Sequence, residues 1–180
     1  MHPYRMQRLI KDRGKDQVIN VAQRASLYQT INQLLREGLI TFWETTRQEG
    51  FPERTLYQLT DQGHLTAQAW MRDMLSEPTR EFPEFPAAVS LLPLLTPDDA
   101  IHQMEIREAK LITQIALFDK EIESEAGRLA RLFLLETEYM RIMLDAELRW
   151  IRSLIADLRS GQLTWTQDWM NPSVPPDTQD

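Results

Sequence analysis

The apolar residues in the first part of the chain follow a spacing that predicts two helices. Residues 4–10 form a short amphipathic pattern that stops near Gly14. Within residues 23–38 the apolar positions recur at intervals of three and four, as on one face of a helix. These positions are Leu27, Ile31, Leu34 and Leu35. Gly38 follows them, where a left-handed residue ends a helix without steric strain.

Two short strands are predicted directly after this helix. Residues 39–45 and 55–59 are rich in β-branched and aromatic side chains. The polar stretch 46–54 between them contains Gly and Pro and must turn. Thr60 is a good N-cap for a further helix that runs to about Leu75. Helix, turn, helix, strand, turn, strand and helix is the order of a winged helix-turn-helix.

The rest of the chain has a helical pattern only. Five prolines come first and exclude one continuous helix between the two parts: Pro78, Pro83, Pro86, Pro93 and Pro97. Two long apolar seams follow. Their positions are Ile101, Met104, Leu111, Ile115, Phe118 and Ile122 in the first, and Phe133, Met140, Leu144, Leu148, Ile151, Ile155 and Leu158 in the second. Glu108 interrupts the first seam, and each seam needs a partner helix, either the other seam or a second subunit.

The predicted fold class is mainly α with a small β wing. An N-terminal winged helix-turn-helix precedes a C-terminal dimerisation domain of long helices. The predicted segments are a DNA-binding domain at 1–76, a Pro-rich connector at 77–96, a helical dimerisation domain at 97–160 and a tail at 161–180.

Charge is distributed unevenly along the 180 residues, whose formal net charge is −7. Residues 1–36 contain seven Lys or Arg and two Asp, a net charge of +5. Residues 81–180 contain nine basic and eighteen acidic side chains, a net charge of −9. A basic head on an acidic body suits a protein that presents one end to a polyanion. Uneven surface charge without any function is the alternative.

The helix within residues 23–38 has a polar face of the kind that reads DNA. The side chains off its apolar stripe are Arg24, Ser26, Tyr28, Gln29, Asn32 and Gln33. Asn and Gln can pair with adenine, Arg with guanine or phosphate, and Ser and Tyr with phosphate. Arg47 and Arg54 flank the predicted turn and are candidates for backbone or minor-groove contacts. The alternative is that these side chains form a solvated helix face without a function. The Gly-Leu-Ile sequence and the two strands that follow the helix argue against this alternative.

These residues resemble the PadR family of bacterial transcriptional regulators. The resemblance is carried by Ser26-Leu-Tyr-x-x-Ile-x-x-Leu-x-x-Glu-Gly-Leu-Ile40 and by Tyr57-x-Leu-Thr-x-x-Gly63, with His2-Pro-Tyr4 as a smaller match. It covers about the first 75 residues, and the helical part is similar in layout to members with an extended C-terminal domain. The resemblance implies a homodimer on a palindromic operator, usually a repressor released by a small molecule. It also implies that Ser26, Tyr28 and Gln29 lie at the groove and Arg54 at the wing.

Two features depart from the family pattern. PadR-like proteins have an apolar helix of roughly a dozen residues ahead of the His-Pro-Tyr motif, which helps to close the winged-helix core. The present sequence starts inside that motif, so we expect truncation at an internal methionine, with substitution by the C-terminal helices as the alternative. Glu49 and Glu53 make the predicted wing more acidic than is usual in the family.

Aromatic and thioether side chains gather towards the C-terminal end. They are Tyr139, Met140, Met143, Trp150, Trp165 and Trp169. Such groups adapt to flat apolar ligands, which makes Met143 and Trp150 candidate contacts for a small aromatic effector. Plain core or dimer packing is the alternative.

Other chemistry finds little support in the sequence. The chain has no cysteine, and its three histidines are far apart and lack carboxylates at a recurring ligand spacing, so neither a disulfide nor a metal site is expected. Phosphate-binding glycine loops and nucleophile motifs are absent, so we predict neither an enzyme nor a cofactor. No apolar stretch is long enough for a membrane span, and the N-terminus is polar and basic without the apolar core of a signal peptide behind it. A cytoplasmic location is therefore expected.

The favoured hypothesis is a dimeric, sequence-specific DNA-binding transcriptional regulator, acting as a repressor that a small molecule releases. The net charge of −7 and the partly acidic wing leave a second hypothesis open. In that hypothesis the winged helix is a protein-interaction scaffold that does not bind DNA. A ligand sensor with modest DNA affinity before ligand binding is a third.

Overall fold

The structure is a computed structural model that describes residues 3–12, 14–15, 24–46, 54–78 and 82–166. Contacts divide the chain into two compact units, 1–81 and 82–180. Within the described ranges, every helix is too short or too polar to cross a lipid bilayer.

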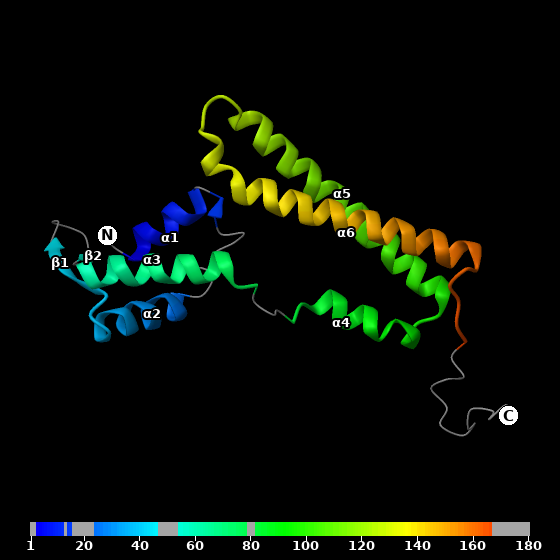
Figure 1. Cartoon of the computed structure of the whole chain (residues 1–180), viewed down its shortest axis with the longest axis horizontal. Coiled ribbons are helices and arrows are strands. Elements are labelled where there is room, and N and C mark those ends of the chain that lie inside the picture. Colours follow the sequence, from blue (N-terminus) through cyan, green and yellow to red (C-terminus); the bar gives the residue numbers. More distant parts are fainter. Residues whose placement is uncertain (1–2, 13, 16–23, 47–53, 79–81, 167–180) are drawn as a thin grey trace, which may run out of the picture. The chain divides into compact units, whose positions relative to one another are not determined.

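The first unit has the order of elements that the sequence predicts (Figure 1). Its elements are α1 (Pro3–Asp12), α2 (Arg24–Arg36), β1 (Ile40–Thr46), β2 (Arg54–Leu59) and α3 (Asp61–Ser76). The predicted helix of residues 4–10 and the recognition-helix candidate are thus both helical. Residues 16–23, which lead into α2, and the turn at 47–53 lie outside the described part of the chain.

Gly38 ends α2 as the apolar pattern predicts. Its φ of 68° is left-handed, a conformation that favours glycine. The Gly38 N–H donates to the Leu35 carbonyl at 3.1 Å, and the Leu39 N–H donates to the Leu34 carbonyl at 2.9 Å. This pair of bonds is the Schellman motif, which satisfies the last helical carbonyls and turns the chain directly into β1.

Strands β1 and β2 form a two-stranded antiparallel sheet, the predicted wing. Ile40 lies opposite Leu59 and Phe42 opposite Tyr57, whose ring centroids are 5.5 Å apart. The register shifts between Phe42 and Glu44, so Trp43 is an extra residue in β1. A bulge of this kind bends the strand and increases its twist.

The start of α3 is tied to the turn that ends α2. The Thr60 hydroxyl accepts a hydrogen bond from the Gly63 N–H at 2.9 Å and donates to the Gly38 carbonyl at 2.8 Å. The Thr60 N–H also donates to the Leu39 carbonyl at 3.1 Å. One threonine therefore caps α3, as the sequence predicts, and joins it to the end of α2.

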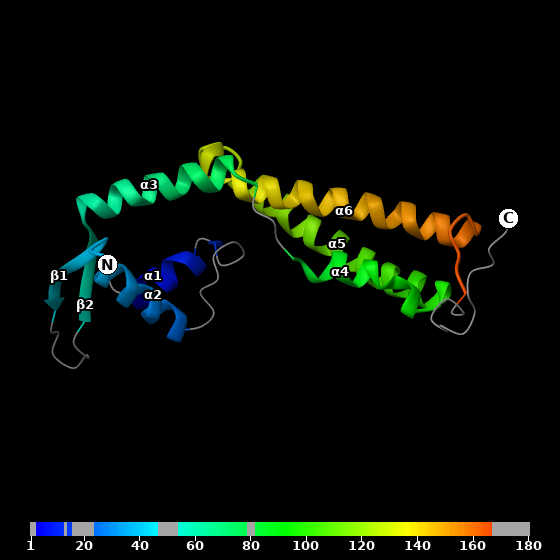
Figure 2. The same cartoon turned by 60° about the horizontal axis from the view of Figure 1, so that its bottom comes forward.

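The second unit is a long antiparallel helical hairpin with a short helix against it (Figure 2). Its elements are α4 (Glu84–Ser90), the 3-10 turn η2 (Leu92–Leu94), α5 (Pro97–Glu125), the 3-10 turn η3 (Arg131–Phe133) and α6 (Leu135–Ser160). The two predicted seams meet each other, because the buried residues of α5 and α6 form one core cluster. The Pro-rich stretch is thus not all irregular: it contains α4 and η2, which pack against this cluster through Phe85, Val89 and Leu92.

Ion pairs flank the seam between α5 and α6. Glu108, which interrupts the apolar pattern, accepts a hydrogen bond from Arg152 at 2.7 Å. Arg141 donates to Asp119 at 2.9 Å, and Arg159 pairs with Glu105. The charged positions therefore lie at the edge of the seam, where they remain hydrated and pair across it.

Candidate nucleic-acid interface

The packing of α2 sets which of its side chains point outward. Ile31 is buried, and Leu27 and Leu34 are half-buried, so they form the inward side of the helix. The described side chains that the sequence assigns to the groove are all on the exposed side: Ser26, Tyr28, Gln29, Asn32 and Gln33. Tyr28 is 49% exposed despite its apolar ring. The structure thus brings these five candidates to one solvent-facing surface.

The five side chains differ in how far they are already engaged. Gln33 donates from Nε2 to the Glu37 carboxylate at 2.9 Å, a contact within the same helix. Gln29 and Asn32 make no hydrogen bond to the described residues, so their amide groups are available to a partner. Amides of this kind can donate to and accept from one adenine edge.

Three basic candidates are only partly covered by the structure. Arg24 is the first residue of α2 and Arg54 the first of β2, but their side chains lie outside what is described. Arg47 lies outside the described residues altogether. Exposed positive charge in the same unit also comes from Arg5 and Lys11 of α1.

The wing carries an exposed aromatic surface that the sequence reasoning missed. Phe42 and Trp43 are 63% and 64% exposed, although strands usually bury one side. Two consecutive aromatics cannot both face the core of a regular strand, because successive side chains point to opposite faces. That adjacency was the available signal for an exposed ring.

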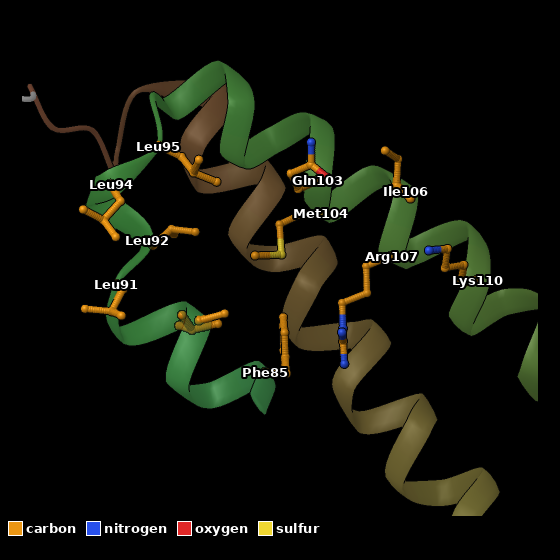
Figure 3. Close-up of a pocket in the computed structure, with 12 residues that line it drawn as sticks. Phe85, Leu91, Leu92, Leu94, Leu95, Gln103, Met104, Ile106, Arg107 and Lys110 are labelled. Atoms are coloured by element: carbon orange, nitrogen blue, oxygen red, sulfur yellow. The ribbon is translucent and has the colours of Figure 1, made fainter. Parts of the chain in front are cut away.

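The effector candidates Met143 and Trp150 both lie on α6, two turns apart, and each is about half exposed. Trp150 packs edge-to-face on Phe85 of α4, with ring centroids 6.0 Å apart. Phe85 lines a cavity of about 540 Å³ between α4, η2 and α5 (Figure 3). Neither Met143 nor Trp150 is among the residues that line this cavity. The sequence does not predict this cavity, because a Pro-rich stretch is typical of a connector.

Solved structures provide the decisive comparison. Bacillus subtilis PadR in complex with operator DNA matches with a TM-score of 0.71 over 88% of this chain and 89% of that one. The chain has the PadR fold. The identity over the match is 20%, so the likeness concerns the fold, and at that level it confirms the resemblance noted from the sequence.

Two further structures with this likeness differ in what they bind or do. Bacillus subtilis PadR in complex with p-coumaric acid matches at 17% identity and a TM-score of 0.70, over 88% of this chain and 90% of that one. The Vibrio cholerae virulence activator AphA matches at 16% identity and a TM-score of 0.63, over the same shares of the two chains. No protein-family model matches the chain, and no curated protein matches its sequence.

The PadR fold confirms the predicted fold class. A mainly helical chain with a two-stranded wing is what both the elements and the structural matches show. In the described part of the chain, no group of three His, Asp or Glu side chains could hold a metal ion.

Proposed function

We propose that the protein is a sequence-specific DNA-binding transcriptional regulator in which α2 enters the major groove. The observation that carries this proposal is the exposed pair Gln29 and Asn32, which make no hydrogen bond to the described residues and lie on a helix whose end is fixed by Thr60. A recognition helix needs such rigidity, because a bidentate amide–base pair requires accurate placement. The operator complex of Bacillus subtilis PadR supports the assignment. DNA binding of this kind needs no catalysis. We expect the protein in the cytoplasm, where a bacterial chromosome lies.

We further propose that it acts as a homodimer on a palindromic operator. Besides its buried seam, α6 has a second apolar stripe that is about half exposed: Leu135, Tyr139, Ile142, Met143 and Trp150. A stripe at this spacing is suited to a second helix. A two-fold dimer would present two α2 helices, one to each half-site.

The dimer is expected to act as a repressor that a small aromatic effector releases, with Met143 and Trp150 as candidate contacts. The p-coumaric acid complex of Bacillus subtilis PadR supports an effector of this class. Titration of the protein's tryptophan fluorescence with phenolic acids tests it. No change across such a series, with the protein folded, would contradict the effector assignment.

A gel-shift experiment with the DNA upstream of the protein's own gene tests DNA binding. We expect a shifted band that weakens steeply between about 50 and 200 mM salt, because phosphate contacts release counterions. A duplex of scrambled sequence is the control. Equal binding to both duplexes, or no shift at low salt, would contradict a sequence-specific regulator.

A second candidate function is a protein-interaction scaffold without DNA binding. The exposed aromatics Phe42 and Trp43 favour it, since aromatic side chains are enriched in protein interfaces. In that case no salt-sensitive shift appears, and Trp43→Ala weakens partner binding while Gln29→Ala does not.

A further inference from the structure

The cavity of the second unit has walls made chiefly of aliphatic side chains. It lies between α4, η2 and α5, and its volume of about 540 Å³ is in the range of small-molecule sites. Its lining includes the half-buried Val89, Leu92 and Leu95 and the buried Met104. Methyl and thioether groups accept a flexible apolar body, because they pack without directional requirements.

Among the described residues that line the cavity, only Phe85 is aromatic, and its ring already contacts two side chains. The Arg107 guanidinium lies over the ring of Phe85, 3.6 Å from its centroid. The Trp150 ring makes a T-shaped contact with the same ring, at an interplanar angle of 84°. Arg107 therefore covers one face of the Phe85 ring. A flat ligand that stacked on this face would have to displace Arg107, whereas an aliphatic chain needs no ring face.

The polar side chains of the cavity lie on one side of α5. Gln103, Arg107 and Lys110 are spaced by four and three residues, so they lie on one face of the helix. Arg107 is held by the Glu147 carboxylate, whose oxygen lies 2.5 Å from Nε. Lys110 is exposed and makes no ion pair with the described residues.

The charges of the lining favour an anionic head group. Among the described residues that line the cavity, two are cationic and none is acidic. Arg107 is neutralised by Glu147, so the cationic group of the lining that has no ion pair with the described residues is the Lys110 ammonium. A single ammonium at the rim of an apolar cavity matches one carboxylate better than a doubly charged phosphate.

We propose that this cavity binds an aliphatic monocarboxylate, with its chain between α4 and α5 and its carboxylate at Lys110. The site is separate from the α6 stripe that holds Met143, and it does not depend on DNA binding. Trp150 contacts Phe85, which lines the cavity, so a ligand bound in the cavity should also alter the fluorescence of Trp150.

Isothermal titration of the full chain with three ten-carbon probes tests the proposal. Decanoate, decan-1-ol and decylamine have the same chain and differ in the charge of the head group. We expect decanoate to bind about fivefold more tightly than decan-1-ol, the effect of one exposed ion pair, and decylamine to bind most weakly.

Matched variants locate the binding. Lys110→Gln should weaken decanoate about fivefold and leave decan-1-ol unchanged, whereas Lys120→Gln, the same change at an exposed lysine outside the cavity, should alter neither. Ala88→Phe places a ring in the cavity from an exposed position and should abolish binding of both probes. Circular dichroism confirms that each variant is folded.

Several results would overturn the proposal. Absence of decanoate binding, equal affinity for the three head groups, or an equal effect of the two lysine variants would each do so. If p-coumarate competes with decanoate and binds more tightly, the ligand of the cavity is aromatic and not aliphatic. If decanoate binding is lost as the protein self-associates, the cavity is a contact site for a second copy of the chain. Gel shifts with the same variants separate these results from a failure of DNA binding.

Discussion

Gly63 lies against Leu39 so closely that a Cβ on Gly63 would be 1.9 Å from the Leu39 carbonyl oxygen. That oxygen also accepts the Thr60 N–H, so it cannot move without breaking the junction between α2 and α3. The approach of two backbones, rather than a special backbone conformation, is what requires glycine at this position.

We expect Gly63→Ala to destabilise the first unit by roughly 2–4 kcal/mol, because the junction must shift to admit a methyl group. Thermal unfolding followed by circular dichroism measures it. Gly38→Ala is the comparison: its φ is 68° but its Cβ would meet nothing within 4 Å. It should cost only about 1 kcal/mol of backbone strain. Equal losses for the two variants would contradict the close-approach argument.

Gln29→Ala should weaken operator binding by about 1–3 kcal/mol and relax the base preference, because it removes a bidentate pair. Gel shifts with the operator and with single-base variants measure both effects. Gln68→Ala, a change at an exposed position of α3, is the control. Unchanged affinity and selectivity of the Gln29 variant would mean that α2 is not the recognition helix.

The hairpin of the second unit should depend on its core more than on its ion pairs. Ile151 is fully buried in the cluster of α5 and α6, and Ile151→Ala should cost about 2–5 kcal/mol. Glu108→Gln removes the carboxylate that pairs with a half-exposed Arg152, and should cost less than about 1 kcal/mol. Urea denaturation of the two variants compares the losses. A larger loss for Glu108→Gln would show that the ion pairs dominate.

The stability of the hairpin should also fall in acid through Glu138. Hydrogen bonds from the Arg131 guanidinium, at 2.8 Å for the shortest, lower the pKa of this carboxyl. A lowered pKa in the folded protein stabilises it while the carboxylate is charged. That contribution is present above the unfolded pKa of about 4.3 and is lost as the pH falls through the lower folded value.

Thermal midpoints measured from about pH 6 to about pH 3 test this contribution. Glu138→Gln should flatten the acid part of the profile, whereas Glu123→Gln, at an exposed position of α5, should not. An identical pH profile for the wild type and the Glu138 variant would refute it.

Most of the secondary structure could be predicted from local signals in the sequence. The apolar spacing predicts α2, Gly38 predicts where α2 ends, and Thr60 predicts where α3 begins. Each of these effects acts within a few residues of the chain. The partner of each long seam could not be decided locally, since the same pattern suits another helix of the chain or a second subunit. The α5–α6 cluster decides that question for the buried seam.

The cavity and the contacts that individual side chains make could not be predicted from the sequence. Phe133 fits the second seam by spacing but is exposed, because it lies in η3 before α6 begins. Phe85 looks like part of a Pro-rich connector, and only the packing of α4 shows that it meets Trp150 and Arg107. Contacts between residues distant in sequence leave no periodic pattern.

The junction of α2 with α3 is made largely of backbone atoms and one threonine hydroxyl, while Gln29 and Asn32 take no part in it. Substitutions at those two outward positions therefore leave the support of the helix intact. If α2 reads DNA, the protein can acquire a new operator preference by exchanging surface amides, without an intermediate that folds less well. Specificity and foldability would then be inherited as separate traits.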